Sequence, residues 1–576
     1  MDIISDIKLD FKVVKHDLLK GIYECSQRGL SQTVKWLSEM NYALKHIKLF
    51  SEEMPQIKDD CENELEEFLI AKSYFDVKEY DRCAHFVKNC TKQKPRFLYF
   101  YSRYLSIEKK NLDNMTDTNC PLDPTKNDAL KDLCTELKID YYENKLDGYC
   151  IYLYGVILKK LDLSHLAIDI FIESVKSEPL LWCAWYELGK IIPDKNRIFS
   201  SHLPDHWMKY FFIAHAYLEQ LNNDESLQIY NTLYTMGLEN STYIMSQIAL
   251  GHHNRRKLDE AINMFKNILT TDPYRLDNLD TYSNLLYVLE LKKDLADLAH
   301  KVVNIDKYRV ETCCVIGNYY SLRSDHAKAV LYFQRALKLN PQFLSAWTLM
   351  GHEFMEMKNT NAAIQSYRHA IEINARDYRA WYGLGQTYEI LKMPNYCLHY
   401  YKQAQQLKPN DSRMVIALGE AYEKLDKTEN ALKCYYKACS LGDVEGTALI
   451  KLAKLYDKLG ETENAAAAFT EFCLREEDRD IKCFEEQAEF YNALQYLANY
   501  HLKKGELDDA YTYAYKCMEC EETKEQGKAL LKSIAARRIE QEPDQGVAMN
   551  ETIANMSMAN EETSSNMDMV FSPSAI

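Results

Sequence analysis

Apolar residues recur along the chain with a fixed period of 34 residues. Seven consecutive positions keep this spacing without a slip, and they are Met245, Leu279, Cys313, Trp347, Trp381, Val415 and Leu449. Further apolar residues follow each position at helical spacing and return in a second group before the next period begins. The pattern predicts two amphipathic helices per period, with the same helix pair repeated along the chain.

Each period also places a small residue in the first helix, and every period except that of Leu279 places an aromatic residue in the second. In the period of Trp381 these are Gly385 and Tyr401, followed by Ala404 and, at the end, Pro409. A small residue lets two helices approach closely, and proline cannot continue a helix. A helix–turn–helix period of 34 residues is typical of the tetratricopeptide repeat. We therefore predict an all-α, superhelical solenoid of these repeats, a fold that presents long binding surfaces.

The repeat pattern predicts five segments. The polar insertion within the second segment carries Pro121 and Pro124 and is expected to be a loop or a loosely attached helix. The segments are an N-terminal helical region (1–60), degenerate repeats (61–235, with the insertion at 111–144), regular repeats (236–480), a last repeat and cap (481–538) and an acidic tail (539–576).

The predicted tail differs from the rest of the chain in composition. It contains seven acidic residues and no Lys or Arg, mixed with Asn, Ser, Thr and Met. Such a segment buries too little apolar surface to offset its ordering entropy, so we expect residues 539–576 to be disordered. The dipeptide Ser572-Pro573 is a minimal proline-directed phosphorylation motif, which makes Ser572 a phosphorylation candidate.

Composition and charge exclude several classes of function. The chain is 47% apolar and has a net charge of −16, without a basic stripe, which argues against nucleic-acid binding. The apolar runs are too short for a membrane span. The 17 cysteines are an odd number and fall mostly on predicted core positions such as Cys313 and Cys397, as expected of reduced thiols.

Motifs for catalysis or metal binding are weak. Cys517 and Cys520 have the spacing of a metal or redox pair, but no second pair accompanies them, and structural zinc needs four ligands. No phosphate-binding loop, nucleophile elbow or kinase motif is present. We expect no enzyme activity, no cofactor and no metal site.

Several stretches are not explained by the repeat consensus. They include residues 71–82 (AKSYFDVKEYDR), 307–314 (KYRVETCC), 318–323 (NYYSLR) and 376–386 (RDYRAWYGLGQ). In these stretches the chain resembles the cell division cycle protein 23 family, which provides the eighth subunit of the anaphase-promoting complex, or cyclosome. The resemblance runs from about residue 25 to about residue 535 and leaves the tail unassigned.

The resemblance implies a non-catalytic scaffold within a cell-cycle-regulated ubiquitin ligase that controls anaphase onset and mitotic exit. It implies other subunits of that complex as partners, a homodimer formed through the N-terminal repeats, and a location in nucleus and cytoplasm. It also implies that the groove of the C-terminal repeats receives the short C-box motif of a coactivator.

Repeat geometry indicates which residues line that groove. The first helix of each repeat forms the concave face, at positions one, five and eight residues after the apolar position that opens the period. Carboxylates there can pair with an arginine of a ligand, and an aromatic ring can stack on its guanidinium. The predicted coactivator-binding residues are Asn318, His352, Tyr382, Gln386, Glu389 and Glu420, with Glu423 nearby.

A co-chaperone or another peptide-binding adaptor is the alternative. Repeat proteins of that kind clamp a C-terminal carboxylate with lysine and asparagine side chains. Here Cys314, Thr348 and Tyr382 occupy positions where lysine would be needed, and the predicted groove is acidic. This electrostatic mismatch disfavours an acidic ligand.

Overall fold

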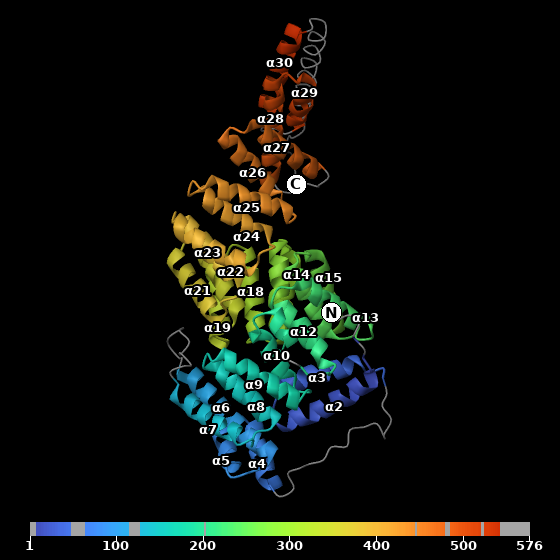
Figure 1. The fold of residues 1–576 in the computed structure, drawn as a ribbon, viewed down its shortest axis with the longest axis vertical. Coiled ribbons are helices and arrows are strands. Elements are labelled where there is room, and N and C mark those ends of the chain that lie inside the picture. The colour runs from blue at the N-terminus through green and yellow to red at the C-terminus, as the bar shows by residue number, and fades with distance from the viewer. Residues whose placement is uncertain are drawn as a thin grey trace, which may run out of the picture. The chain divides into compact units, whose positions relative to one another are not determined.

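The computed structural model describes residues 7, 9–47, 64–114, 127–200, 203–443, 446–477, 484–519 and 524–541. All regular secondary structure in these ranges is helical (Figure 1). The helices follow one another in pairs, and the fold is an all-α tetratricopeptide-repeat solenoid, as predicted. The chain divides into two compact units, Met1–Met357 and Lys358–Ile576, called here the first and second unit.

The helices of the first unit precede the break at Met357. They are α2 (Phe11–Gln27), α3 (Ser31–Ala43), α4 (Leu65–Asp76), α5 (Tyr80–Phe86), α6 (Gln93–Asn114), α7 (Asp128–Tyr142), α8 (Gly148–Lys160), α9 (Ser164–Ser177), α10 (Trp182–Ile191), α11 (Lys195–Ser200), α12 (Met208–Glu219), α13 (Asn223–Thr235), α14 (Thr242–Asn254), α15 (Leu258–Thr271), α16 (Leu279–Val288), α17 (Lys292–Ile305), α18 (Val310–Leu322), α19 (His326–Leu339) and α20 (Leu344–Glu356).

The second unit continues the same pairing. Its helices are α21 (Thr360–Ile373), α22 (Tyr378–Ile390), α23 (Pro394–Leu407), α24 (Ser412–Glu423), α25 (Thr428–Ser440), α26 (Thr447–Leu459), α27 (Thr462–Glu477), α28 (Phe484–Lys504), α29 (Leu507–Lys516), a short 3₁₀ turn (Cys517–Glu519) and α30 (Lys524–Gln541).

The seven periodic apolar positions all lie on first helices, from Met245 on α14 to Leu449 on α26. In three of the regular repeats the glycine of the first helix faces an aromatic ring of the second, and the pairs are Gly317 with Phe333, Gly385 with Tyr401 and Gly419 with Tyr435. A Cβ added at Gly385 would lie 2.3 Å from Cε1 of Tyr401, and one at Gly419 would lie 2.6 Å from Cε1 of Tyr435. No larger residue fits without moving these rings, so the sequence pattern reports a direct helix–helix contact.

The turn that ends each first helix is also periodic. A residue with positive φ occurs at the same place in seven consecutive repeats, and only the last of these residues is glycine. A left-handed residue at this place ends a helix and redirects the chain, at a steric cost of about 1 kcal/mol for a side chain other than glycine. The residues are Arg256, Glu290, Ser324, Lys358, Lys392, Asp426 and Gly460.

The N-terminal helices α2 and α3 form a hairpin that packs on repeats far along the chain. Trp36 of α3 stacks on Trp182 with ring centroids 4.2 Å apart and planes 10° apart, and it meets Phe211 and Tyr243 edge-on. Trp36 is buried, with 7% of its surface exposed. In Figure 1 these two helices lie beside α8, α10 and α12. One side chain of the hairpin thus contacts three different repeats.

Charged groups anchor the turn of the hairpin and its second helix, α3. Arg28, after α2, lies 3.8 Å above the ring of Tyr149 and 3.4 Å from the carboxylate of Asp147. Further along, Lys35 pairs with Asp277, which also pairs with Arg309. A second bridge joins Glu39 to Arg275, with 3.4 Å between oxygen and nitrogen. The hairpin therefore spans the first unit from α8 to α18.

The predicted insertion at 111–144 does not lie loosely on the surface where the structure describes it. Residues 128–142 form α7, whose Leu130, Leu133 and Leu137 are buried in the core of the first unit. The polar residues between these leucines face solvent, which is why the overall composition suggested a loop. The remainder of the insertion, 115–126, lies outside the described residues.

The C-terminal end of the described chain is helical. α30 continues to Gln541, three residues into the segment predicted as the acidic tail. The rest of that segment lies outside the described residues, and so does the phosphorylation candidate Ser572.

Replacing Trp36 by alanine tests the hairpin contact. We expect Trp36→Ala to destabilise the first unit by about 3–5 kcal/mol, the usual cost of truncating a buried tryptophan. Amide hydrogen exchange should rise at α10, α12 and α14 as well as at α3, because the lost ring contacts all of them. Trp36→Phe is the matched control and should show a smaller rise. Exchange that changes only within α2 and α3 would contradict a role in tying the repeats together.

Candidate functional site

The six predicted binding residues are divided between the two compact units. Asn318 on α18 and His352 on α20 belong to the first unit. Tyr382, Gln386 and Glu389 on α22 belong to the second, as does Glu420 on α24. The two groups are therefore described separately.

In the first unit, the amide of Asn318 takes part in internal contacts. The side chain is buried, and its nitrogen donates hydrogen bonds to Ser283 Oγ at 2.8 Å and to Asn284 Oδ1 at 2.6 Å, both on α16. The amide therefore joins two successive first helices. His352 is exposed on α20. A role for either residue in peptide binding stays a prediction.

The residue next to His352 makes a similar connection. Glu353 is buried and accepts a hydrogen bond from Ser321 Oγ at 2.6 Å. Its second oxygen lies 2.9 Å from Nδ1 of His326, at the start of α19. A buried carboxylate needs such partners, because an unpaired one would lose its hydration without compensation.

In the second unit, the three predicted residues of α22 are neighbours. Their spacing of four and three residues places them on one face of the helix. Glu389 accepts a hydrogen bond from the hydroxyl of Tyr401 at 2.7 Å. The ring of Tyr382 lies 5.4 Å from the ring of Tyr401, with planes inclined by 35°. Tyr401 thus holds both an aromatic ring and a carboxylate in place, with half-buried Gln386 between them along the helix.

The next repeat has the same arrangement one period later. Glu423 on α24 accepts a hydrogen bond from the hydroxyl of Tyr435 at 3.1 Å. Glu420, one turn earlier, pairs with Lys451 of α26 at 3.0 Å. We use the name first-helix face for the surface formed by Tyr382, Gln386, Glu389, Glu420 and Glu423.

Lysines that sequence reasoning missed cover these carboxylates. Glu389 pairs with Lys424, and Glu423 pairs with Lys458. The two lysines are 34 residues apart, as are the two glutamates, so each pair joins one repeat to the next. The shared spacing was the available signal, since both lysines fall nine residues after the apolar position that opens a period. The face is therefore less negative than its glutamates alone suggest.

The pairing changes the ionisation of these groups. Partial burial raises the pKa of Glu423, but the Lys458 ammonium and the Tyr435 hydroxyl outweigh burial and leave the pKa below its ordinary value. For Lys424, desolvation lowers the pKa, but the hydrogen bond and charge of Glu389 outweigh it and leave the pKa raised. The two shifts favour the charged forms of Glu423 and Lys424.

A polar cavity of about 610 Å³ lies near the C-terminal repeats of the second unit. Asp457 and Tyr496 share a hydrogen bond of 3.0 Å at its wall. Asn499 lies five residues after Leu494. Within its repeat Asn499 therefore occupies the same first-helix position as Gln386 and Glu420. The full lining comprises Asp457, Thr462, Glu463, Tyr496, Asn499, Tyr500, Lys503 and Lys504.

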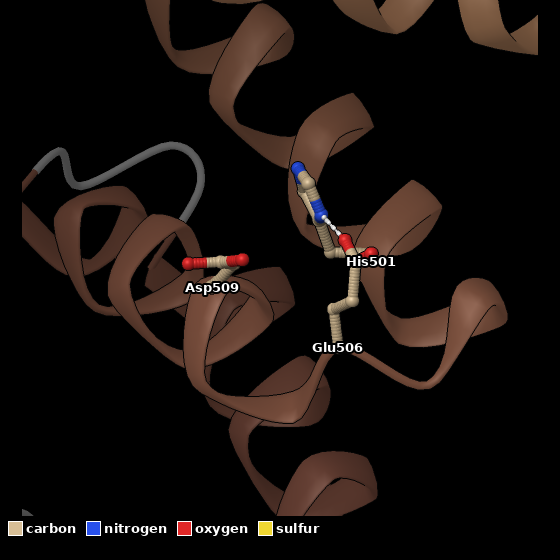
Figure 2. A group of neighbouring side chains, drawn as sticks. All are labelled: His501, Glu506 and Asp509. Carbon is tan, nitrogen blue, oxygen red and sulfur yellow. Dashed lines mark hydrogen bonds and ion pairs between the residues drawn. The ribbon is translucent and has the colours of Figure 1, made fainter.

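His501, near the end of α28, lies close to Glu506 and Asp509 at the start of α29, and Figure 2 shows this group, which could bind a cation. Nδ1 of His501 lies 2.7 Å from a carboxylate oxygen of Glu506, and Asp509 offers a third ligand atom within 4.8 Å of the others. The ammonium of Lys504 already lies 3.0 Å from Glu506. The group is one ligand short of a tetrahedral zinc site and carries no metal assignment.

The cysteine pair of the sequence is described only in part. Cys517 is buried at the end of α29, while Cys520 lies outside the described residues.

None of the described helices combines the length and the apolar character that a membrane crossing requires.

Comparison with protein families identifies two kinds of similarity. The model of the family described as "Anaphase promoting complex subunit 8 / Cdc23" matches residues 13–249. Tetratricopeptide-repeat models match four stretches between residues 310 and 478, and another matches residues 351–390.

Several named relatives are similar to the chain over long stretches. "Anaphase-promoting complex subunit 8" of Dictyostelium discoideum is 38% identical over 409 residues, which cover 61% of this chain and 69% of the relative. "Cell division cycle protein 23 homolog" of Homo sapiens is 52% identical over 53% of this chain and 51% of the relative. The subunit 8 of Arabidopsis thaliana is 44% identical over 51% of each chain. The matched part thus spans about half the length of the human and plant relatives.

A solved structure shares the fold. The crystal structure of the APC/C hetero-tetramer Cut9-Hcn1 contains a chain that superposes with a TM-score of 0.50 and 16% sequence identity. The match covers 86% of this chain and 98% of that chain. At this identity the likeness concerns the repeat fold alone.

Proposed function

The chain belongs to the family of anaphase-promoting complex subunit 8, or Cdc23, and we propose that it is a non-catalytic scaffold subunit of that complex. As such it serves in a ubiquitin ligase that controls anaphase onset and mitotic exit, in the nucleus and the cytoplasm. Its partners are the other subunits of the complex and the coactivators that carry a C-box. The relative from Dictyostelium discoideum, which matches over 409 residues, supports the assignment most directly.

The arrangement of side chains on α22 supports the proposal that the chain binds a coactivator peptide. Tyr382 and Glu389 are held by the same residue, Tyr401, and both lie on the first-helix face. A carboxylate beside an aromatic ring suits an arginine side chain, which can pair with the carboxylate and stack on the ring. We therefore assign the C-box to the first-helix face of the second unit.

The co-chaperone alternative requires lysines that are free to bind a ligand carboxylate. Lys424, Lys451 and Lys458 each pair with a carboxylate of the preceding repeat. Lys454 pairs with Glu489 at 3.0 Å. These pairs weigh against a carboxylate clamp on this face.

The N-terminal repeats offer a surface for the homodimer. Helix α4 buries Phe68 and Phe75 on one side but exposes apolar side chains on the other, and Leu69 is 57% exposed. Contiguous exposed apolar residues mark interaction surfaces, and solenoid ends need a cap. The exposed set on α4, α5 and the turn between them is Leu65, Leu69, Ile70, Val77 and Phe86.

Purification of the tagged chain from mitotic extract tests the scaffold assignment. We expect a cullin-like subunit, a RING subunit and other repeat subunits to co-purify, as mass spectrometry would show. Recovery of chaperones without any ligase subunit would contradict the proposal and favour the co-chaperone alternative.

Charge reversal at Glu389 tests the peptide site. We expect Glu389→Arg to weaken binding of a synthetic C-box peptide by at least about tenfold, because a charge-assisted hydrogen bond is replaced by repulsion. Isothermal titration would measure affinity, and circular dichroism would show that the helices are intact. Glu429→Arg, at the exposed start of α25, is the matched control. Equal affinity for the peptide in both variants would remove Glu389 from the site.

Substitution of Leu69 tests the dimer surface. We expect Leu69→Asp to convert a dimer into a monomer, because a buried charge at the seam would be unpaired. Light scattering coupled to size exclusion would report the mass. Leu331→Asp on α19, where Leu331 is 63% exposed, is the control and should leave the mass unchanged. A dimer that survives Leu69→Asp would place the seam elsewhere.

A further inference from the structure

The glutamate–lysine pairs of the second unit share one layout. In each pair the carboxylate comes from the first helix of one repeat and the ammonium from the first helix of the next. Glu389 pairs with Lys424, Glu423 with Lys458 and Glu420 with Lys451. The arrangement recurs with the repeat, so it is a property of this face.

The two partners differ in how deeply they are placed. The side chain of Glu389 is 27% exposed and that of Lys424 is 51% exposed. For Glu423 and Lys458 the values are 25% and 66%. The lysines therefore form the outer layer, and a ligand that approaches the carboxylates from solvent meets the lysines first.

The glutamate of each pair is held in place independently of the lysine. The hydroxyl of Tyr401 donates to Glu389, and that of Tyr435 donates to Glu423. Both tyrosines are buried against the glycine of their own repeat. If the lysine moves away, the carboxylate keeps its hydrogen bond from the tyrosine. Among the described residues neither Lys424 nor Lys458 forms a second ion pair, although the charge of Glu420 also acts on Lys424.

Energetics allow such an exchange. A solvent-exposed ion pair contributes only about 0.2–1 kcal/mol, because water screens it and two long side chains must be ordered. An arginine offers a planar set of donors that can bind a carboxylate through two hydrogen bonds, which a lysine cannot do. A lysine in a ligand would only replace one ammonium by another.

We propose that Lys424 and Lys458 are internal competitors for the carboxylates of the first-helix face, which an arginine of a bound peptide displaces and a lysine does not. The pairs thereby make the face selective for arginine-bearing peptides. This inference rests on the proposed function, in which that face binds a coactivator peptide.

The test uses the full chain, a C-box peptide and the same peptide with its arginine replaced by lysine. Lys424→Met removes the competing charge and keeps the length of the side chain. We expect it to tighten binding of the arginine peptide by about two- to fivefold, the equivalent of one exposed pair. We expect it to reduce the preference for arginine over lysine as well. Lys402→Met is the control, because Lys402 is exposed on the second helix α23 and has no carboxylate partner among the described residues.

The outcomes separate this inference from the proposed function. If the unmodified chain binds the arginine peptide and Lys424→Met leaves its affinity and selectivity unchanged or lowers its affinity, the lysine is no competitor and only the inference fails. If the unmodified chain does not bind but the double variant Lys424→Met, Lys458→Met does, the arginine does not displace the lysines, and both the inference and peptide binding by the unmodified chain are wrong. If neither binds, the proposed site is wrong, and the inference fails with it.

Discussion

The contact between a glycine of the first helix and an aromatic ring of the second sets the geometry on which the repeats of α18, α22 and α24 depend. Tyr401 fills the space that Gly385 leaves, since a Cβ there would lie 2.3 Å from the ring. The same ring supports Tyr382, and its hydroxyl reaches Glu389. Core packing and the ligand-facing groups are therefore linked through one side chain. A change at Gly385 would move the site as well as the core.

Periodicity extends this arrangement from one repeat to the next. Tyr435 and Glu423 repeat the contact, and Lys424 and Lys458 connect each carboxylate to its neighbouring repeat. Single pairs of this kind are weak, but they recur at one position of the repeat and are oriented alike. The face consequently has positioned carboxylates below an adjustable layer of lysines.

Sequence reasoning succeeded where the determinant is local and periodic. The first helices, their glycines and the residues that face outward from α22 follow from the 34-residue spacing and helical geometry. It failed where contacts join distant segments. Nothing in the repeat spacing connects Trp36 with Trp182 and Tyr243, because the pattern describes neighbouring repeats only. It allowed a loosely attached helix in the insertion but did not predict that α7 packs into the core, because its three buried leucines are separated by polar residues. Lys424 and Lys458 share the 34-residue spacing, but that spacing does not reveal that they pair with glutamates of the preceding repeat.

The two units differ in the parts of the described chain that cover their surfaces. In the first unit the α2–α3 hairpin inserts buried Trp36 among aromatic rings, and ion pairs anchor its turn and its second helix. A ligand would have to displace a large apolar contact to reach that surface, at a cost of several kcal/mol. In the second unit the described contacts over the carboxylates are exposed lysines, each worth about 1 kcal/mol or less. A peptide of modest affinity can displace the lysines but not the contact of Trp36. The difference in burial supports the proposal that exchangeable peptide binding belongs to the second unit.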